Sequence, residues 1–178
     1  MKKTTRLIMI TFFISFGLLI AANSGIAANS AKKSKVLAKI DKIKITQADF
    51  DAYLSMFEAK SKYRPTTPAA RTKLLNHMID RILLLEEARK SGYFEDEELK
   101  KHGSLSKAER ETMVLRKLLI DRIAKPATIA DPTVTIYLEK HPDLTFKQAQ
   151  KKLIGERQQQ LYEKLREKIR KGRKIVIL

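Results

Sequence analysis

The most regular hydrophobic pattern of the chain lies between residues 73 and 92. Its apolar residues recur at the i, i+3, i+4, i+7 spacing of an α-helix, and Leu84 widens the apolar stripe. The stripe consists of Leu74, Leu75, Met78, Ile79, Ile82, Leu83, Leu85 and Ala88. Basic residues and then Gly92 follow, which is a typical helix end. The pattern predicts a central helix that other elements must cover on more than one side.

Further helices are predicted on both sides of this one. Thr46 and Asp49 favour a helix start, which leads to a face of Phe50, Tyr53, Leu54 and Phe57. Capping-box patterns at residues 106–109 and 145–148 open two later helices, and Asp131 is predicted as the N-cap of a short helix between them. The last helix extends to about Lys171 with sparse apolar residues. Gly155 lies inside it, which indicates a close packing contact or a bend.

Short alternating patterns are confined to the two ends of the helical region. Residues 36–45 form two such runs around the pair Asp41-Lys42, and residues 174–178 form a third apolar run. An isolated hairpin is only marginally stable in water, so we expect a third strand to join it. The predicted fold is mostly α with a small antiparallel β-sheet, in which the strand at 174–178 returns to the N-terminal hairpin.

The first residues resemble a targeting segment. Met1–Arg6 is basic, residues 7–22 are mainly apolar, and Gly25-Ile26-Ala27 follows the small-x-small cleavage rule. We therefore predict a signal peptide at 1–27, with cleavage somewhere within 22–28, and a polar spacer at 28–35. An uncleaved anchor is the alternative. A cleaved signal peptide implies export across the inner membrane and a periplasmic location.

Net charge and composition limit the classes of molecule that the chain is expected to bind. The chain has a formal charge of +17, and loss of Lys2, Lys3 and Arg6 would leave 34 basic and 20 acidic residues, a net +14. Such a charge suits acidic clients or anionic lipid headgroups, and nucleic acid is an unexpected partner for an exported chain. There is no cysteine, so disulfides and thiolate metal sites are excluded.

Motifs for catalysis are absent from the sequence. The three histidines lack H-E-x-x-H spacing, and the chain has no G-x-S-x-G, P-loop or G-x-G-x-x-G motif. We expect no cofactor, no metal site and no enzymatic activity, although a pair of reactive residues brought together from distant positions stays open.

The order of these segments resembles the SurA family of periplasmic foldases. "LLNHMIDRILLLEEARKSG" is similar to the family's N-terminal chaperone domain, and "ATIADPTVTIYLEKHPD" is similar to its helix before the parvulin isomerase domain. The stretch "LTFKQAQKKLIGERQQQLYEKLREKIRKGRKIVIL" resembles the segment that returns to the N-terminal domain. The resemblance implies one chaperone domain at 36–178, closed by the strand at 174–178. The family's parvulin domain would lie between Asp143 and Leu144, and here nothing is inserted.

This resemblance implies a periplasmic holdase that binds unfolded or partly folded exported proteins in an apolar groove, without isomerase activity. The alternative is a dedicated assembly factor or partner of one cell-envelope complex. Aromatic and methionine side chains suit a promiscuous surface, so the candidate client-binding residues are Tyr53, Met56, Phe57, Tyr63 and Met113. The competing interpretation is that these residues belong to an ordinary core.

Overall fold

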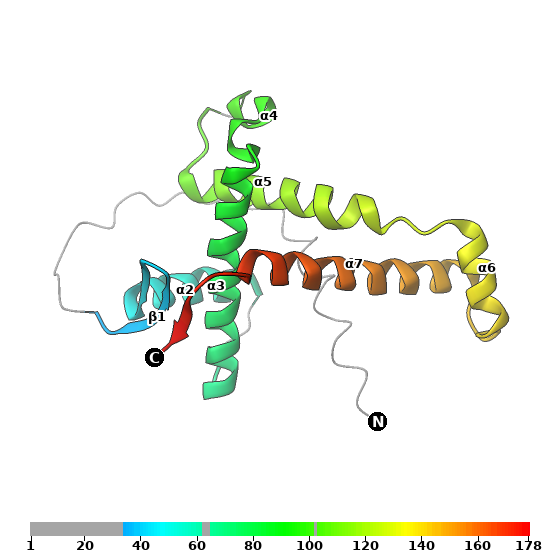
Figure 1. The fold of residues 1–178 in the computed structure, drawn as a ribbon, viewed down its shortest axis with the longest axis horizontal. Helices are drawn as coiled ribbons and strands as arrows, with labels where there is room; N and C mark the ends of the chain where they lie inside the picture. The colour runs from blue at the N-terminus through cyan, green and yellow to red at the C-terminus, as the bar shows by residue number, and fades with distance from the viewer. Residues whose placement is uncertain (1–33, 62–64, 102) are drawn as a thin grey trace. The chain divides into compact units, whose positions relative to one another are not determined.

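The computed structural model describes residues 34–61, 65–101 and 103–178. These residues form two compact units (Figure 1). The first contains the described residues of 34–87 together with 169–178, and we call it the sheet unit. The second contains the described residues of 88–168, and we call it the helical unit. The predicted signal peptide lies outside the described residues, so its limits and those of the spacer stay predictions.

The sheet unit contains a three-stranded antiparallel sheet. Its strands are β1 (Val36–Ile40), β2 (Ile43–Thr46) and β3 (Ile175–Ile177), in the order β2-β1-β3. Figure 1 shows β3, in red, beside the N-terminal hairpin in blue. The predicted return of the C-terminal strand to the hairpin is therefore confirmed, and β1 is the central strand.

The register gives the two faces of this sheet different chemistry. Ala38 pairs with Ile45 on one side and Ile177 on the other, and Ile40 pairs with Ile43 and Ile175. Because residues directly opposite one another share a face, these six residues form an apolar face, with Ala38, Ile40 and Ile45 fully buried. The opposite face carries the row Lys44, Lys39 and Val176.

Two helices complete the hydrophobic core of the sheet unit. α2 (Gln47–Ser61) begins after Thr46, whose backbone N–H donates to Asp49 Oδ2 over 2.8 Å. The Asp49 N–H donates back to Thr46 Oγ1 over 3.2 Å, which confirms the predicted cap. α3 (Pro68–Lys90) is the predicted central helix, and its final residues belong to the helical unit. The buried apolar side chains of these helices in the sheet unit are Phe50, Leu74, Leu75, Ile79, Leu83 and Leu84.

The helical unit continues from the left-handed Gly92, as predicted for the end of α3. It contains η1 (Tyr93–Glu95), α4 (Glu97–Lys101), α5 (Lys107–Leu119), η2 (Ile120–Ala124), η3 (Lys125–Ala127), α6 (Asp131–Glu139) and α7 (Phe146–Arg170), whose last two residues belong to the sheet unit. Its buried apolar residues include Leu99, Val114, Leu118, Ile123, Ala127, Val134 and Ala149.

The ends of the helices follow the sequence closely, with one correction. Ser106 with Glu109 forms the predicted capping box of α5, and Thr145 forms hydrogen bonds of the same kind with Gln148 at α7. At α6 the N-cap is Ala130 rather than Asp131, which is the first residue of the helix. The carbonyl of Ala130 accepts the N–H of Thr133, so the turn begins one residue earlier than the Asp-Pro pattern indicates.

Gly155 lies in α7 without the close packing contact that was one of the two explanations predicted for it. Apart from its chain neighbours and the backbone of α7 itself, no atom of the described residues comes within 4 Å of the position that a Cβ atom would occupy there. Its cost to helix stability is therefore not offset by a contact that only glycine permits.

Replacing Gly155 with alanine is expected to stabilise the protein by about 1 kcal/mol, because alanine loses less backbone entropy in a helix. Thermal unfolding of the two chains measures the effect. An unchanged or lower midpoint would show that α7 needs the flexibility of glycine at this position.

Candidate client-binding surface

Asp41 joins the hairpin of the sheet unit to the C-terminal strand. Its backbone N–H donates to the Lys174 carbonyl over 2.9 Å, and the Lys174 N–H donates to Asp41 Oδ1 over 2.8 Å. Asp41 adopts a left-handed conformation with φ 51°, which aspartate tolerates better than most residues. The carboxylate of the turn therefore holds the start of the strand that pairs with β1.

Arg173 links the same turn to α3. Its Nε lies 2.7 Å from Asp41 Oδ2 in an ion pair, and its Nη2 donates to Glu86 Oε2 over 2.6 Å. One guanidinium therefore connects the hairpin, the C-terminal segment and the central helix. Sequence reasoning missed this cluster, because its members are distant in the chain.

A second guanidinium joins the end of α7 to α3 within the sheet unit. Arg170 Nε donates to Oδ1 of the buried Asp80 over 2.6 Å, and Arg170 Nη2 donates to Asn76 Oδ1 over 3.3 Å. Tyr53 of α2 interacts electrostatically with the same region. Burial raises the pKa of its hydroxyl, the Arg81 charge lowers that pKa, and the Asp80 charge raises it. These contacts connect Tyr53 with the polar groups of α3.

The structure describes the side chains of three of the five predicted client-binding residues. Tyr53 and Met56 are half-buried on α2 in the sheet unit, whereas Met113 is half-buried on α5 in the helical unit. The side chain of Phe57 lies outside the description, as does Tyr63. Their role in binding stays a prediction.

A different set of apolar side chains is exposed on the sheet. Four large apolar residues of its strands and C-terminal end are accessible to solvent: Ile43, Val176, Ile177 and Leu178. The segments that contain them, residues 35–46 and 173–178, are basic. They carry a single acid, Asp41, and six basic residues: Lys35, Lys39, Lys42, Lys44, Arg173 and Lys174. The signal in the sequence was the uncharged run 175–178 at a predicted edge strand. Because β2 and β3 lie on opposite sides of β1, Ile43 is separate from the other three, and we call Val176, Ile177 and Leu178 the sheet patch.

The helical unit exposes two further large apolar residues, Ile136 of α6 and Phe146 at the start of α7. The rings of Tyr137 and His141, which lie between them in the sequence, pack in a tilted arrangement with centroids 4.1 Å apart. The Lys152 ammonium lies 5.4 Å from the centre of the Tyr137 ring. This end of the unit combines exposed apolar groups with a cation, as the sheet patch does.

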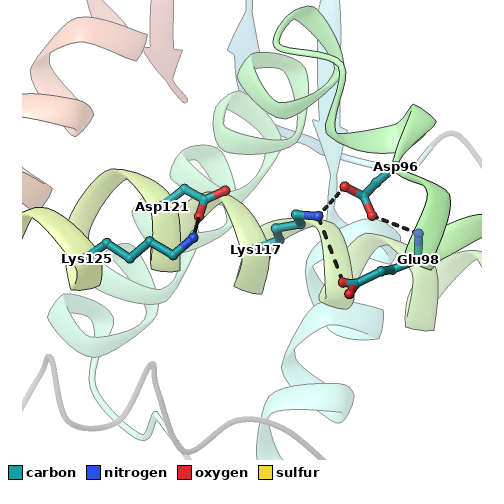
Figure 2. Close-up of polar contacts among 5 residues, drawn as sticks. All are labelled: Asp96, Glu98, Lys117, Asp121 and Lys125. Carbon is teal, nitrogen blue, oxygen red and sulfur yellow. Dashed lines mark hydrogen bonds and ion pairs between the residues drawn. The ribbon is translucent and has the colours of Figure 1, made fainter.

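Ion pairs join the segment before α5 to that helix, because Lys117 of α5 contacts Asp96 and Glu98. Figure 2 shows the Lys117 ammonium between Asp96, to which it donates a hydrogen bond, and Glu98 at 4.0 Å. Asp96 Oδ1 also accepts the Glu98 N–H over 3.0 Å, and Lys125 Nζ lies 2.6 Å from Asp121 Oδ1. Lysine side chains pair with the carboxylates of Asp96 and Asp121, and Asp96 also accepts a backbone N–H. These contacts stabilise the local structure.

The pair of Lys117 with Asp96 predicts a specific dependence of stability on pH. The hydrogen bond from Lys117 lowers the pKa of Asp96, so this carboxylate stabilises the fold above its unfolded-state pKa of about 3.9 and loses that contribution as pH falls. The difference in melting temperature between the native protein and Asp96→Asn should therefore be largest near about pH 6 and shrink as the pH falls below about 3.9. Glu98→Gln, which alters the longer and more exposed pair, serves as the control. A difference independent of pH would contradict this assignment.

The described residues contain no group of three or more histidines, aspartates or glutamates that could hold a metal ion. In the same part of the chain, no helix combines the length and apolar character that crossing a membrane requires. Both units expose apolar side chains in segments that also carry basic residues.

Comparison with protein families identifies the fold. The family model described as the SurA-like N-terminal domain matches residues 1–105, which is more than half of the chain. The chain belongs to the SurA-like N-terminal domain family. Searches among curated proteins and among solved structures each found no match.

The family match ends before α5, whereas the resemblance seen in the sequence extends to residue 178. For the later part the pairing of β3 with β1 is the relevant observation, because it completes the sheet begun by the matched segment. Membership relates this chain to chaperones, and the matched family is that of the N-terminal chaperone domain rather than of the parvulin isomerase domain.

Proposed function

We propose that this protein is a periplasmic holdase chaperone that binds unfolded or partly folded exported proteins. Membership of the SurA-like N-terminal domain family supports the chaperone relation. The observation that carries the proposal is the sheet patch, a group of exposed apolar side chains on a strongly basic chain. Exposed apolar surface of this kind is typical of interaction sites.

The charge of the chain indicates which clients bind best. With a net charge of +17, or +14 after loss of residues 1–27, the protein attracts acidic polypeptides over roughly a Debye length of about 8 Å at physiological salt. Apolar contacts then hold the client without requiring a defined sequence. Binding of this kind does not require faster rotation about prolyl peptide bonds, so isomerase activity is not part of the proposal.

The test is suppression of light scattering by the full chain with several unrelated unfolded proteins, both acidic and basic. A general holdase suppresses the aggregation of all of them, and the acidic clients more strongly at low salt than at high salt. Suppression confined to one envelope protein would favour a dedicated assembly factor instead. No suppression with any client would overturn the proposal.

Two accompanying measurements examine the rest of the proposal. Cell fractionation should place the protein in the periplasm with residues 1–27 removed. A proline-isomerisation assay on a model peptide should give the uncatalysed rate, and a rate clearly above it would indicate an enzymatic site.

A further inference from the structure

The outer edge of β3 is open in the described structure. β3 pairs with β1 on one side, and no described residue forms a strand on its other side. The pairing pattern shows which backbone groups face this open side. Leu178 donates to the Leu37 carbonyl and Asp41 donates to the Lys174 carbonyl, so the hydrogen-bonded pairs alternate and include Val176 with Lys39. The N–H and C=O groups of Ile175 and Ile177 therefore point away from β1.

β3 is only three residues long and follows Lys174, but it carries few of the other features that prevent strand addition. Residues 175–178 contain no charged side chain and no proline, and the register shift found in the sheet lies between β1 and β2. Their side chains are also accessible: Val176 is 37%, Ile177 is 43% and Leu178 is 62% exposed. An apolar strand edge with free backbone groups is a template for another strand.

We propose that β3 binds an extended client segment by strand addition, and that the preferred segment alternates apolar and acidic residues. The two faces of the sheet dictate this alternation. One face of an added strand would extend the apolar row that ends at Ile175 and Ile177. The other face would lie beside Val176 and the exposed Lys174, with Lys39 one strand further, about 10 Å away. This inference rests on the proposed holdase function and specifies its binding mode.

The basic charge near β3 favours an acidic client strand over a second copy of the chain as its binding partner. Antiparallel pairing of two β3 edges about a two-fold axis would place Lys174 and Lys39 of both copies on the same face of one joined sheet, and Asp41 is the single acid that residues 35–46 and 173–178 of each copy contain. Asp41 is already held by Arg173 and Lys174. Like charges at such an interface repel, whereas an acidic strand neutralises them.

The primary test uses the full chain and synthetic peptides of about ten residues. One peptide alternates valine and glutamate, a second alternates valine and lysine, and a third is the valine-glutamate peptide N-methylated on alternate residues. Amide hydrogen exchange should slow by about tenfold or more at Ile175 and Ile177 with the first peptide and stay unchanged with the other two. The Val176 amide, which already pairs with β1, reports whether the sheet itself has changed. Binding that leaves Ile175 and Ile177 unprotected, or equal protection by the lysine peptide, would overturn the inference.

Two variants give an independent test. Ile177→Pro removes an N–H that faces the open edge and should weaken peptide binding by about tenfold, whereas Ile177→Val keeps that donor and should bind normally. Lys174→Glu leaves the β3 side chains intact and should reverse the preference toward the valine-lysine peptide. Retained binding by Ile177→Pro, or an unchanged preference in Lys174→Glu, would count against strand addition.

Light scattering distinguishes failure of this inference from failure of the proposed function. If the wild-type chain suppresses aggregation and Ile177→Pro suppresses it equally well, clients bind elsewhere and only the strand-addition mode is wrong. If the wild-type chain suppresses no aggregation, the holdase proposal fails, whatever the peptides do.

Discussion

Replacing Arg170 with methionine is expected to lower the free energy of unfolding by about 3 kcal/mol. Arg170 donates to Asp80 over 2.6 Å, and the Asp80 side chain is only 8% exposed. Removing the guanidinium takes an ion-pair and hydrogen-bond partner from a buried carboxylate, and breaking a buried pair on one side is costly. Asn76 loses a donor at the same time.

Urea unfolding of the full chain, followed by circular dichroism, measures this change. The matched control is Arg157→Met, because Arg157 is an exposed arginine of the same helix, and the expected change is within about 0.5 kcal/mol. Combining Arg170→Met with Asp80→Leu should recover much of the loss, since it removes the buried charge as well. Equal losses in Arg170→Met and Arg157→Met would show that the pair with Asp80 contributes little.

Replacing Ile40 with alanine is expected to destabilise the protein by a similar amount, about 3 kcal/mol. Ile40 lies on the central strand β1 and is 0% exposed. Truncation removes three buried carbon atoms and leaves a cavity, because neighbouring strands on both sides restrict collapse around it.

Ile43→Ala is the natural comparison, because Ile43 is the residue directly opposite Ile40 on the same face of the sheet. Ile43 is 37% exposed on the edge strand β2, so its truncation should cost under about 1.5 kcal/mol. Urea midpoints of the two variants give the difference. If both substitutions cost the same, the burial assigned to the centre of the sheet would be incorrect.

Elements governed by local hydrogen bonds were predictable from the sequence. Thr46 with Asp49 and Ser106 with Glu109 interact across three residues, so their pattern can be read directly. The positive φ angles of Gly92 and Gly172 follow from their places after helical runs. The three-stranded sheet was predictable for another reason: two apolar strand patterns without partners need one another.

Interactions between distant residues were not predictable in the same way. Asp41 meets Lys174 across 133 residues, and nothing local in the pattern of the turn indicates this contact. A two-residue turn of type I′ would need a positive φ at both Asp41 and Lys42, whereas Asp41 has one and Lys42 does not. The candidate binding residues on α2 and α5 were chosen by residue type, and type does not reveal which compact unit a helix joins. Exposure, which identified the sheet patch, depends on the completed fold.

The order of strands in the sheet has a consequence for the timing of folding. β1 and β2 are neighbours in the chain and can form a hairpin as soon as both have been synthesised, but β3 is made more than a hundred residues later. Contacts of such long sequence separation form slowly, because the ends of a large loop must first find each other. Until the ribosome has released residue 177, the central strand has one free side. We therefore expect nascent chains that stop before Arg173 to be much more sensitive to protease at 36–46 than the finished protein.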